Sequence, residues 1–241
     1  MWLGSSQQLV KLDISHVRVL SSCVKAQDTA RDLGVAVVID SQLSLSAHVT
    51  AVCRSGYYQY QLRQLRQAVR SLSEDAKTLV QAFVSCRLDY CNSLFLGISE
   101  GLMNRLQSVQ NAAARLVTGT RRSDHISPVL RQLHWLPVRQ RVDFKVATLV
   151  HESLSGISPP YLADDCRLVA DARERRLRST ASRICVVTRT YSTFNDRAFG
   201  AAGPGLWNSL PSHLKDADIS YSEFRRSLKT LLFGQWGHGA V

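Results

Sequence analysis

The sequence lacks the marks of membrane and secreted proteins. No apolar run in its 241 residues reaches the ~18 residues of a membrane-spanning helix, so we expect no membrane partner. The first residues show no basic leader followed by a long apolar stretch. The six Cys include no CxxC pair, and the His residues have no spacing typical of zinc ligands. These absences predict an intracellular protein, nuclear or cytoplasmic rather than secreted, with reduced thiols and no bound metal.

Motifs for catalysis are also absent. The sequence holds no G-x-S-x-G, no P-loop and no dinucleotide fingerprint. Tyr161-Leu-Ala-Asp-Asp165 differs by one inserted residue from the Tyr-x-Asp-Asp hairpin of two-metal polymerases. Such a hairpin needs flanking apolar strands and a third carboxylate nearby, whereas a charged stretch follows Asp165. We therefore expect a helix or loop here, no catalytic residue, no cofactor in this chain and no enzymatic activity on its own.

Negative charge is scarce, and the positive charge is concentrated. The net charge is +11, and residues 101–150 hold eight Lys or Arg against only Asp124 and Asp143. Arg outnumbers Lys, and its planar guanidinium suits phosphate better than a point ammonium. A localised Arg excess is typical of nucleic-acid binders. A solvated basic surface or a contact with a protein partner remains open.

Hydrophobic periodicity predicts a mostly helical α+β chain. Alternation favours short strands at 9–14 and 16–20, and a β-branched apolar run favours a third at 33–39. A period near 3.6 follows, and Ser155-Gly-Ile-Ser-Pro-Pro160 interrupts it. Beyond that break we expect an extended piece at 184–188 and a turn at 200–205. The predicted helices span 46–71, 74 to Gly97, about 101–118, a short stretch opened by Ser127-Pro128, Pro137 to about 154, and 221–233.

The helix expected from residue 74 carries a wide apolar stripe. Ser73 is a favourable N-cap, and Glu74 and Asp75 place negative charge in the first turn. Gly97 is expected to end the helix. The residues predicted to be buried on the stripe are Leu79, Val80, Phe83, Val84, Leu88, Cys91, Leu94 and Phe95.

The helix at 101–118 has two separate faces. Its apolar residues repeat at helical spacing from Leu102 to Leu116, and Gly119 follows its end. Amide, hydroxyl and Arg side chains gather on the opposite face, where they can bind phosphate, sugar or minor-groove acceptors. A solvated face, or one packed on another part of a larger protein, is the alternative. The predicted nucleic-acid-binding residues are Asn104, Gln107, Asn111, Arg115, Arg121, Arg122, Arg139, Arg141 and Lys145.

Two Trp residues each precede a Leu/Pro turn. Trp135 and Trp207 are expected to anchor these turns in the core, with base stacking as the alternative.

Several motifs together resemble one family. Their order and spacing are similar to the reverse transcriptases of LINE-type (non-LTR, jockey-like) retrotransposons, downstream of the catalytic centre. The motifs that carry the resemblance include Leu88-Asp-Tyr-Cys-Asn-Ser93, Gln110-Asn-Ala-Ala-Ala-Arg-Leu-Val-Thr-Gly119, His134-Trp-Leu-Pro137 and Leu206-Trp-Asn-Ser-Leu-Pro211.

The resemblance implies an organisation and a function. Residues 1–45 would be the end of the palm, 46–155 a helical thumb-like domain holding the primer–template duplex, and 156–241 a C-terminal segment. The expected partners are RNA, DNA or an RNA–DNA hybrid, together with the palm and fingers of the parent RNA-directed DNA polymerase. That parent would need Mg²⁺.

The chain departs from this family because the catalytic carboxylates and the endonuclease are missing. We therefore expect a truncated fragment of a transposable element that retains nucleic-acid binding. A non-functional remnant or a domesticated protein-interaction module is the alternative.

Overall fold

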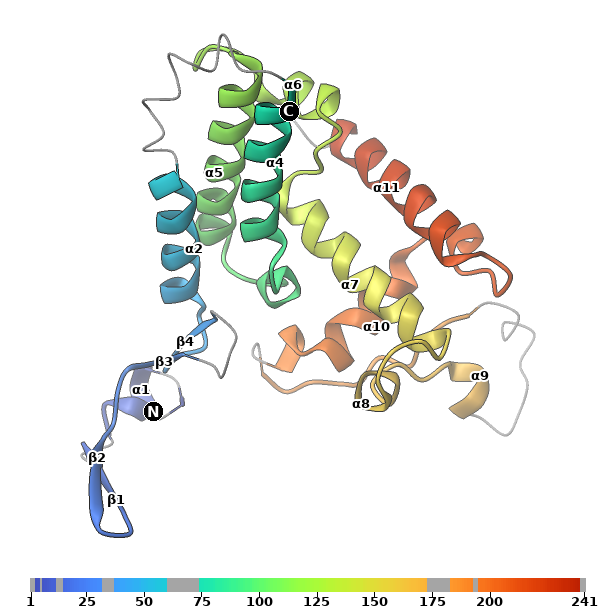
Figure 1. Ribbon diagram of the computed structural model, residues 1–241. Helices are drawn as coiled ribbons and strands as arrows, with labels where there is room; N and C mark the ends of the chain where they lie inside the picture. Colours follow the sequence, from blue (N-terminus) through green and yellow to red (C-terminus); the bar gives the residue numbers. More distant parts are fainter. Residues whose placement is uncertain are drawn as a thin grey trace. The chain divides into compact units, whose positions relative to one another are not determined.

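A computed structural model describes residues 3–4, 6–11, 15–31, 37–59, 74–172, 183–192 and 195–238. The chain is mostly helical, with short N-terminal strands and a C-terminal helix, which confirms the predicted fold class (Figure 1). Contacts divide it into two compact units. The first unit comprises Met1–Cys91 and Ile98–Asp124, and the second comprises Asn92–Gly97 and His125–Val241. The division at 45 and 155 suggested by the resemblance stays a prediction.

The N-terminal strands form two small antiparallel pairs. In the first pair, β1 (His16–Val19) faces β2 (Ser22–Lys25), with Val17 opposite Val24. In the second, β3 (Thr29–Arg31) faces β4 (Val38–Asp40). The strand predicted at 9–14 is wrong at its start, because Leu9 closes a short helix, α1 (Ser6–Leu9). Residues 12–14 and 33–36 lie outside the described residues.

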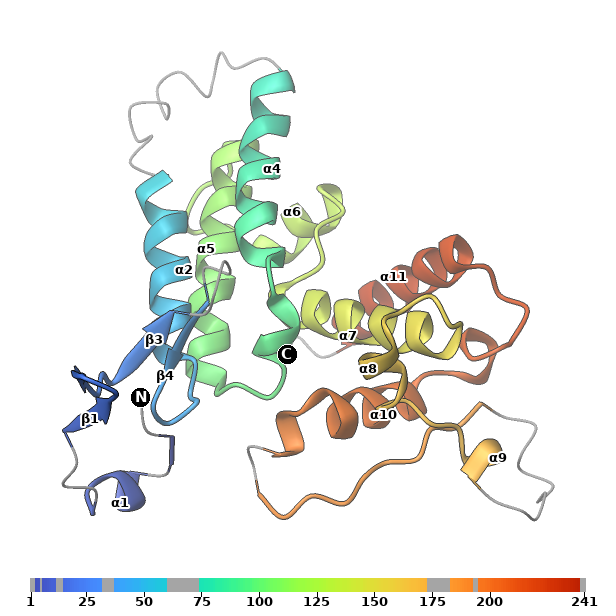
Figure 2. The ribbon, with the colours of Figure 1, turned by 60° about the horizontal axis from the view of Figure 1, so that its bottom comes forward.

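Three helices build the core of the first unit. They are α2 (Ser46–Gln59), α4 (Glu74–Asp89) and α5 (Glu100–Thr118), which run side by side in both ribbon views (Figures 1 and 2). The predicted helix 46–71 is confirmed as far as Gln59. Its remainder and the predicted cap Ser73 lie outside the described residues. The buried side chains between the helices include Val49, Cys53, Val84, Leu88, Leu106, Val109 and Ala113.

A side-chain cap joins β4 to α2. The carboxylate of Asp40 accepts hydrogen bonds from the Ser44 backbone N–H at 2.7 Å and from the Ser44 hydroxyl at 3.0 Å. The Ser44 hydroxyl in turn accepts from the backbone N–H of Ser46 at 3.2 Å, where α2 begins. The first N–H groups of the helix are thereby partly satisfied, which fixes the direction in which α2 leaves the strand.

The apolar stripe predicted after residue 74 is partly wrong. α4 ends at Asp89, and a turn with Cys91 at a φ of 51° leads into the 3-10 helix η3 (Asn92–Phe95). This turn breaks the helical spacing on which the prediction depended. Val84, Leu88 and Phe95 are buried, but Phe83 is 52% and Leu94 44% exposed, and Cys91 is half-buried. The side chains of Leu79 and Val80 lie outside the described part.

Gly97 does not end α4. It follows η3 with a φ of +70°, in a close approach where an added Cβ would lie 2.8 Å from Cγ of Arg197.

Helices also dominate the second unit. α7 (Val138–Leu154) confirms the predicted end near 154, and α11 (Tyr221–His238) begins as predicted but extends beyond 233. The remaining elements are α6 (Ile126–Gln132), α8 (Pro160–Ala163), α9 (Val169–Ala172), η5 (Asn195–Arg197), α10 (Phe199–Ser209) and η6 (Ser212–Leu214).

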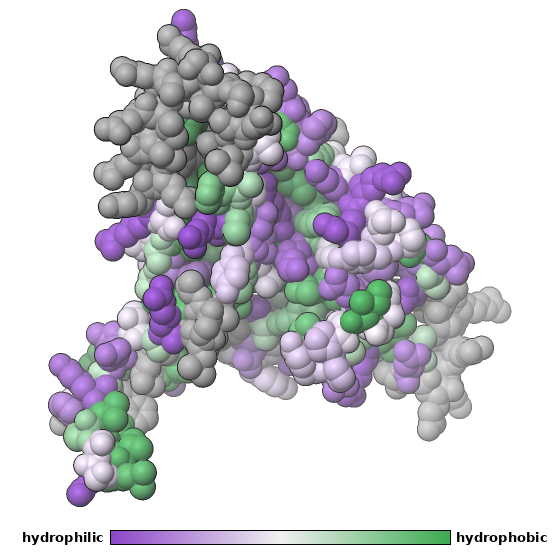
Figure 3. Space-filling model, viewed as in Figure 1, coloured by the Kyte–Doolittle hydropathy of each residue, from purple (hydrophilic) through white to green (hydrophobic). Residues whose placement is uncertain are grey.

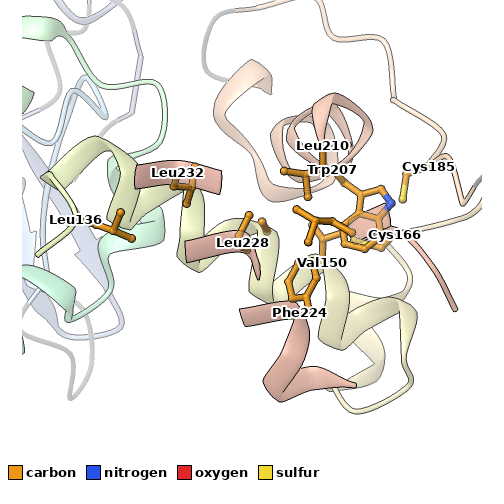
Figure 4. Packing of buried hydrophobic residues seen from close by; sticks show 11 residues of the cluster. Leu136, Val150, Cys166, Cys185, Trp207, Leu210, Phe224, Leu228 and Leu232 are labelled. Carbon is orange, nitrogen blue, oxygen red and sulfur yellow. The ribbon is translucent and has the colours of Figure 1, made fainter. Parts of the chain in front are cut away.

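The core of the second unit is gathered around α7 (Figure 4). Trp207 of α10 and Phe224 and Leu228 of α11 are fully buried against Val150 of α7. The indole Nε1 of Trp207 donates to the carbonyl of Arg183 at 2.8 Å, so its single polar atom is satisfied.

Two expectations in the second unit are wrong. The stretch 200–205 is helical, because Gly203 lets α10 approach α7: an added Cβ would lie 3.0 Å from Cγ2 of Val150. Packing thus overrides the low helix propensity of Gly and Pro. α6 starts one residue before Ser127, with His125 at the N-cap. The extended piece predicted at 184–188 is confirmed around Cys185, which forms an antiparallel bridge with Leu168.

Among the described residues, no helix combines the length and apolar character needed to cross a membrane.

Candidate nucleic-acid interface

The polar face predicted on α5 exists, and part of it is accessible. Asn104 and Ser108 are exposed, whereas Gln107, Asn111 and Arg115 are half-buried. α5 is anchored from the other side by buried residues: Met103, Leu106, Val109, Gln110, Ala113, Ala114 and Val117. We call the accessible strip of Asn104, Ser108 and Arg115 the α5 stripe. These residues are spaced four and seven apart, so they lie in a row along one side of the helix.

The half-buried amides of α5 bind one another. The Nε2 group of Gln107 donates to Oε1 of Gln110 at 2.9 Å and to Oδ1 of Asn111 at 2.8 Å. Gln110 itself is completely buried, which sequence periodicity did not reveal. Both protons of the Gln107 amide are therefore used inside the helix. Asn111 makes no Nδ2 hydrogen bond within the described residues, so that donor remains for a ligand.

The end of α5 brings three predicted Arg residues into one segment. Gly119 takes the left-handed conformation at φ +72°, and its N–H bonds the carbonyl of Arg115 at 2.9 Å. Asp124 then closes the loop. Its carboxylate accepts from the backbone N–H of Arg121 at 3.1 Å, and its carbonyl accepts from Nη2 of Arg115 at 3.3 Å. Arg121 and Arg122 are both exposed on this loop.

The other three predicted site residues lie on α7, in the second unit. Arg139 and Lys145 are exposed, and Arg141 is half-buried. The Nε of Arg141 donates to the carbonyl of Leu136 at 2.9 Å, and the Arg141 carbonyl accepts from Nδ2 of Asn92 at 3.5 Å. Arg141 thus fastens the start of α7 to its own unit. These three residues thus belong to a different unit from the α5 stripe.

One basic groove escaped the sequence prediction. Thr50, Cys53 and Arg54 of α2 and Arg105 and Ser108 of α5 line it. The Nη2 of Arg105 donates to the hydroxyl of Thr50 at 3.1 Å. Ser46, Thr50 and Arg54 recur every four residues within the predicted helix. That spacing places the three side chains on one face of α2, so the sequence could have revealed one wall of the groove. The second wall is α5, and only the packing of α5 against α2 reveals it.

The described residues offer little for covalent chemistry. Burial raises the pKa of the Cys166 thiol to about 11 and that of Cys185 to about 12, so neither is a nucleophile near neutral pH. Asp164 and Asp165 are exposed and follow α8, which confirms the predicted helix or loop. Among the described residues, no group of three or more His, Cys, Asp or Glu side chains could hold a metal.

The two Trp residues are anchors rather than stacking platforms. Trp135 is 2% exposed and Trp207 is fully buried, as expected. Trp207 lies on α10, which ends at Ser209, directly before Leu210 and Pro211.

No protein-family model, curated protein or solved structure matches the chain. The resemblance to retrotransposon polymerases therefore rests on the sequence motifs alone.

Proposed function

We propose that this chain is the thumb and C-terminal region of a LINE-type reverse transcriptase, an intracellular protein whose own activity is to bind an RNA–DNA duplex. Polymerisation belongs, in this proposal, to catalytic carboxylates and Mg²⁺ that this sequence does not supply. The observation that carries the proposal is the Asp124-closed loop, which ties Arg115, at the end of the α5 stripe, to the segment that carries Arg121 and Arg122.

The chemistry of these groups suits a nucleic-acid backbone. Guanidinium groups bind phosphate oxygens through paired N–H donors, and they release counterions when they do so. The amides of Asn104 and Asn111 can donate to sugar hydroxyls and minor-groove acceptors, which require no base sequence. The interface would therefore recognise duplex shape and charge. On α7, Arg139 and Lys145 add exposed cations, whereas Arg141 acts by positioning.

A salt titration tests the proposal. Binding of an RNA–DNA hybrid is measured by filter retention at increasing salt, for the wild-type chain and for Arg115→Ala/Arg121→Ala/Arg122→Ala. Because each lost phosphate contact lowers the slope of log K against log salt by roughly 0.9, the triple variant should lose about 2.7.

The matched control removes the same charge elsewhere. Arg167, Arg189 and Arg226 are exposed residues of the second unit outside the predicted site, and all three are replaced by Ala. This control should keep most of the wild-type slope. Equal losses in the two triple variants would mean that only net charge matters, and an unchanged slope in the first would contradict the proposal.

A protein-interaction module is the second candidate, because the β1–β2 hairpin exposes apolar side chains. Val17, Val19, Leu20 and Val24 are between 40% and 92% exposed, and hydrophobic surface is visible at the hairpin in Figure 3. This candidate predicts that the wild-type chain binds the hybrid with no salt dependence beyond that of an unrelated basic protein. It also predicts that Val17→Ser/Val24→Ser abolishes capture of a protein partner.

A further inference from the structure

The groove between α2 and α5 places two guanidinium groups from different helices on one surface. Arg54 and Arg105 are both exposed, and they share the groove with Thr50 and Ser108. Its open volume is about 440 Å³. The floor is the buried thiol of Cys53, which burial keeps protonated by raising its pKa. The groove is therefore a cationic surface above a neutral floor.

Neither positive charge is neutralised within the described residues. Arg54 makes no hydrogen bond or ion pair there, and Arg105 uses one N–H group on the uncharged hydroxyl of Thr50. No carboxylate is among the residues that line this groove. Two like charges that line one groove repel each other, so an anion in the groove would relieve the repulsion and gain two sets of donors.

A neighbouring hollow carries the nearest carboxylates. It shares Thr50 and Arg54 with the groove and is also lined by Asp28 and Asp40. The Asp40 carboxylate is already occupied by the two hydrogen bonds from Ser44. Asp28 is exposed, and its charge disfavours an anion at that end. The Arg105 end of the groove is consequently the favourable position for an anion.

Thr50 sets the orientation of Arg105. Its hydroxyl donates to the carbonyl of Ser46 at 2.8 Å, which leaves its lone pairs for the Nη2 group of Arg105 at 3.1 Å. On the opposite wall, the hydroxyl of Ser108 donates to the carbonyl of Asn104 at 2.8 Å. Both walls present short side chains, so a phosphate group can approach the helices closely. Thr50 is a positioning residue, and the two Arg are the ligands.

We infer that the α2–α5 groove is a phosphate-binding site that takes a backbone phosphate of the bound nucleic acid. The inference rests on the proposed function for its ligand, because Ser108 belongs to both the groove and the α5 stripe and thus joins the two surfaces. It adds Arg54 and Arg105 to the interface, on the side of α5 that faces α2. The Asp124-closed loop and the groove would then contact different phosphates of one nucleic acid.

The test compares three variants in the hybrid titration. Arg54→Gln/Arg105→Gln should lower the slope of log K against log salt by about 0.9, since the one phosphate held by the two Arg is lost. Arg54→Lys/Arg105→Lys keeps the charge and should restore most of the slope. The matched control, Arg167→Gln/Arg189→Gln, should leave the slope near the wild-type value. Thermal melting followed by circular dichroism establishes that each variant is folded.

A second measurement reads the groove without nucleic acid. Inorganic phosphate, compared with chloride at equal ionic strength, should raise the melting temperature of the wild-type chain more than that of Arg54→Gln/Arg105→Gln. A phosphate effect without a change in the hybrid slope would overturn the nucleic-acid assignment and leave a site for small anions.

The outcomes separate this inference from the proposed function. If Arg54→Gln/Arg105→Gln keeps the wild-type slope while the Arg115, Arg121 and Arg122 variant loses it, the groove inference is wrong and the proposed function stands. If the wild-type chain shows no salt-dependent binding of the hybrid, the proposed function fails and the groove loses its ligand as well.

Discussion

His151 is a base buried in the core of the second unit. It is 3% exposed, and its ring stacks on Phe224 with the centroids 4.3 Å apart. Its Nδ1 has no hydrogen-bond partner among the described residues. Burial lowers the pKa of His151, the nearby Arg183 lowers it further, and Glu152 opposes them. The folded chain therefore keeps this imidazole neutral.

We predict that acid destabilises the chain partly through His151. An unfolded His gains its proton near pH 6.5, whereas the buried ring resists protonation, so the free energy of unfolding falls as the pH drops below about 6.5. Urea unfolding of the wild type and His151→Leu at pH 7.5 and 5.5 measures this. From pH 7.5 to 5.5, the free energy of unfolding of His151→Leu should fall by up to about 1 kcal/mol less than that of the wild type. An equal loss in both proteins would contradict the assignment.

Asp143 of α7 has the opposite pH dependence. Burial raises its pKa to about 6, although the charge of Arg139 partly offsets that effect. Between about pH 4 and 6 the folded state holds more protons at this carboxyl than the unfolded state does, so its destabilising effect grows as the pH rises over this range and is complete above about 6. Asp143→Asn should therefore raise the free energy of unfolding at pH 7 by about 1–2 kcal/mol. The exposed Asp216→Asn is the control, and a less stable Asp143→Asn would disprove the assignment.

At the scale of elements, the contact between α2 and α5 depends on Gly56. A Cβ added there would lie 2.7 Å from Cγ1 of Val109. Gly56→Ala should therefore destabilise the first unit by about 1–3 kcal/mol through overpacking, despite the higher helix propensity of Ala. Val109→Ala in the same chain should recover part of this loss. The control is Gly101→Ala in α5, where the added Cβ meets open space, so this variant should be neutral or stabilising. Denaturant unfolding of the wild type, the two glycine variants and the double variant measures these effects. Equal changes in stability at Gly56 and Gly101 would contradict the overpacking at Gly56.

Hydrophobic periodicity predicted the helices that bury one apolar face. It failed for the helix that forms through tertiary packing despite a low helix propensity. α5 and α7 were found within a residue or two, because their apolar residues repeat regularly over four or more turns. α10 was missed because Gly and Pro argue locally for a turn, and only its contact with α7 makes the helix favourable.

In the candidate site, too, some features follow from helical periodicity and others only from tertiary packing. The exposed position of Asn104 follows from helical spacing alone. The hydrogen bond from Gln107 to Asn111, the role of Asp124 and the groove at Arg105 each depend on distances that a linear sequence does not contain.

At the scale of the molecule, stability should be uneven along the chain. Every residue of β1 and β2 is exposed, whereas α5 and α7 hold rows of buried side chains. Amide hydrogen exchange should consequently be faster in residues 1–45 than in 74–154, because strands without a covered face open at little cost. Uniform protection across both regions would instead indicate that the N-terminal strands form an independent stable domain.

The central claim is that the α5 stripe contacts a nucleic-acid duplex, and photo-crosslinking tests it most directly. Asn104 is replaced by p-benzoylphenylalanine, and the exposed Ser212 of the second unit is replaced in the same way as the control. After irradiation with a labelled RNA–DNA hybrid, the protein substituted at 104 should carry the label, and low salt should increase the yield. Label at 212 but not at 104, or none at either position while the hybrid is bound, would contradict the claim.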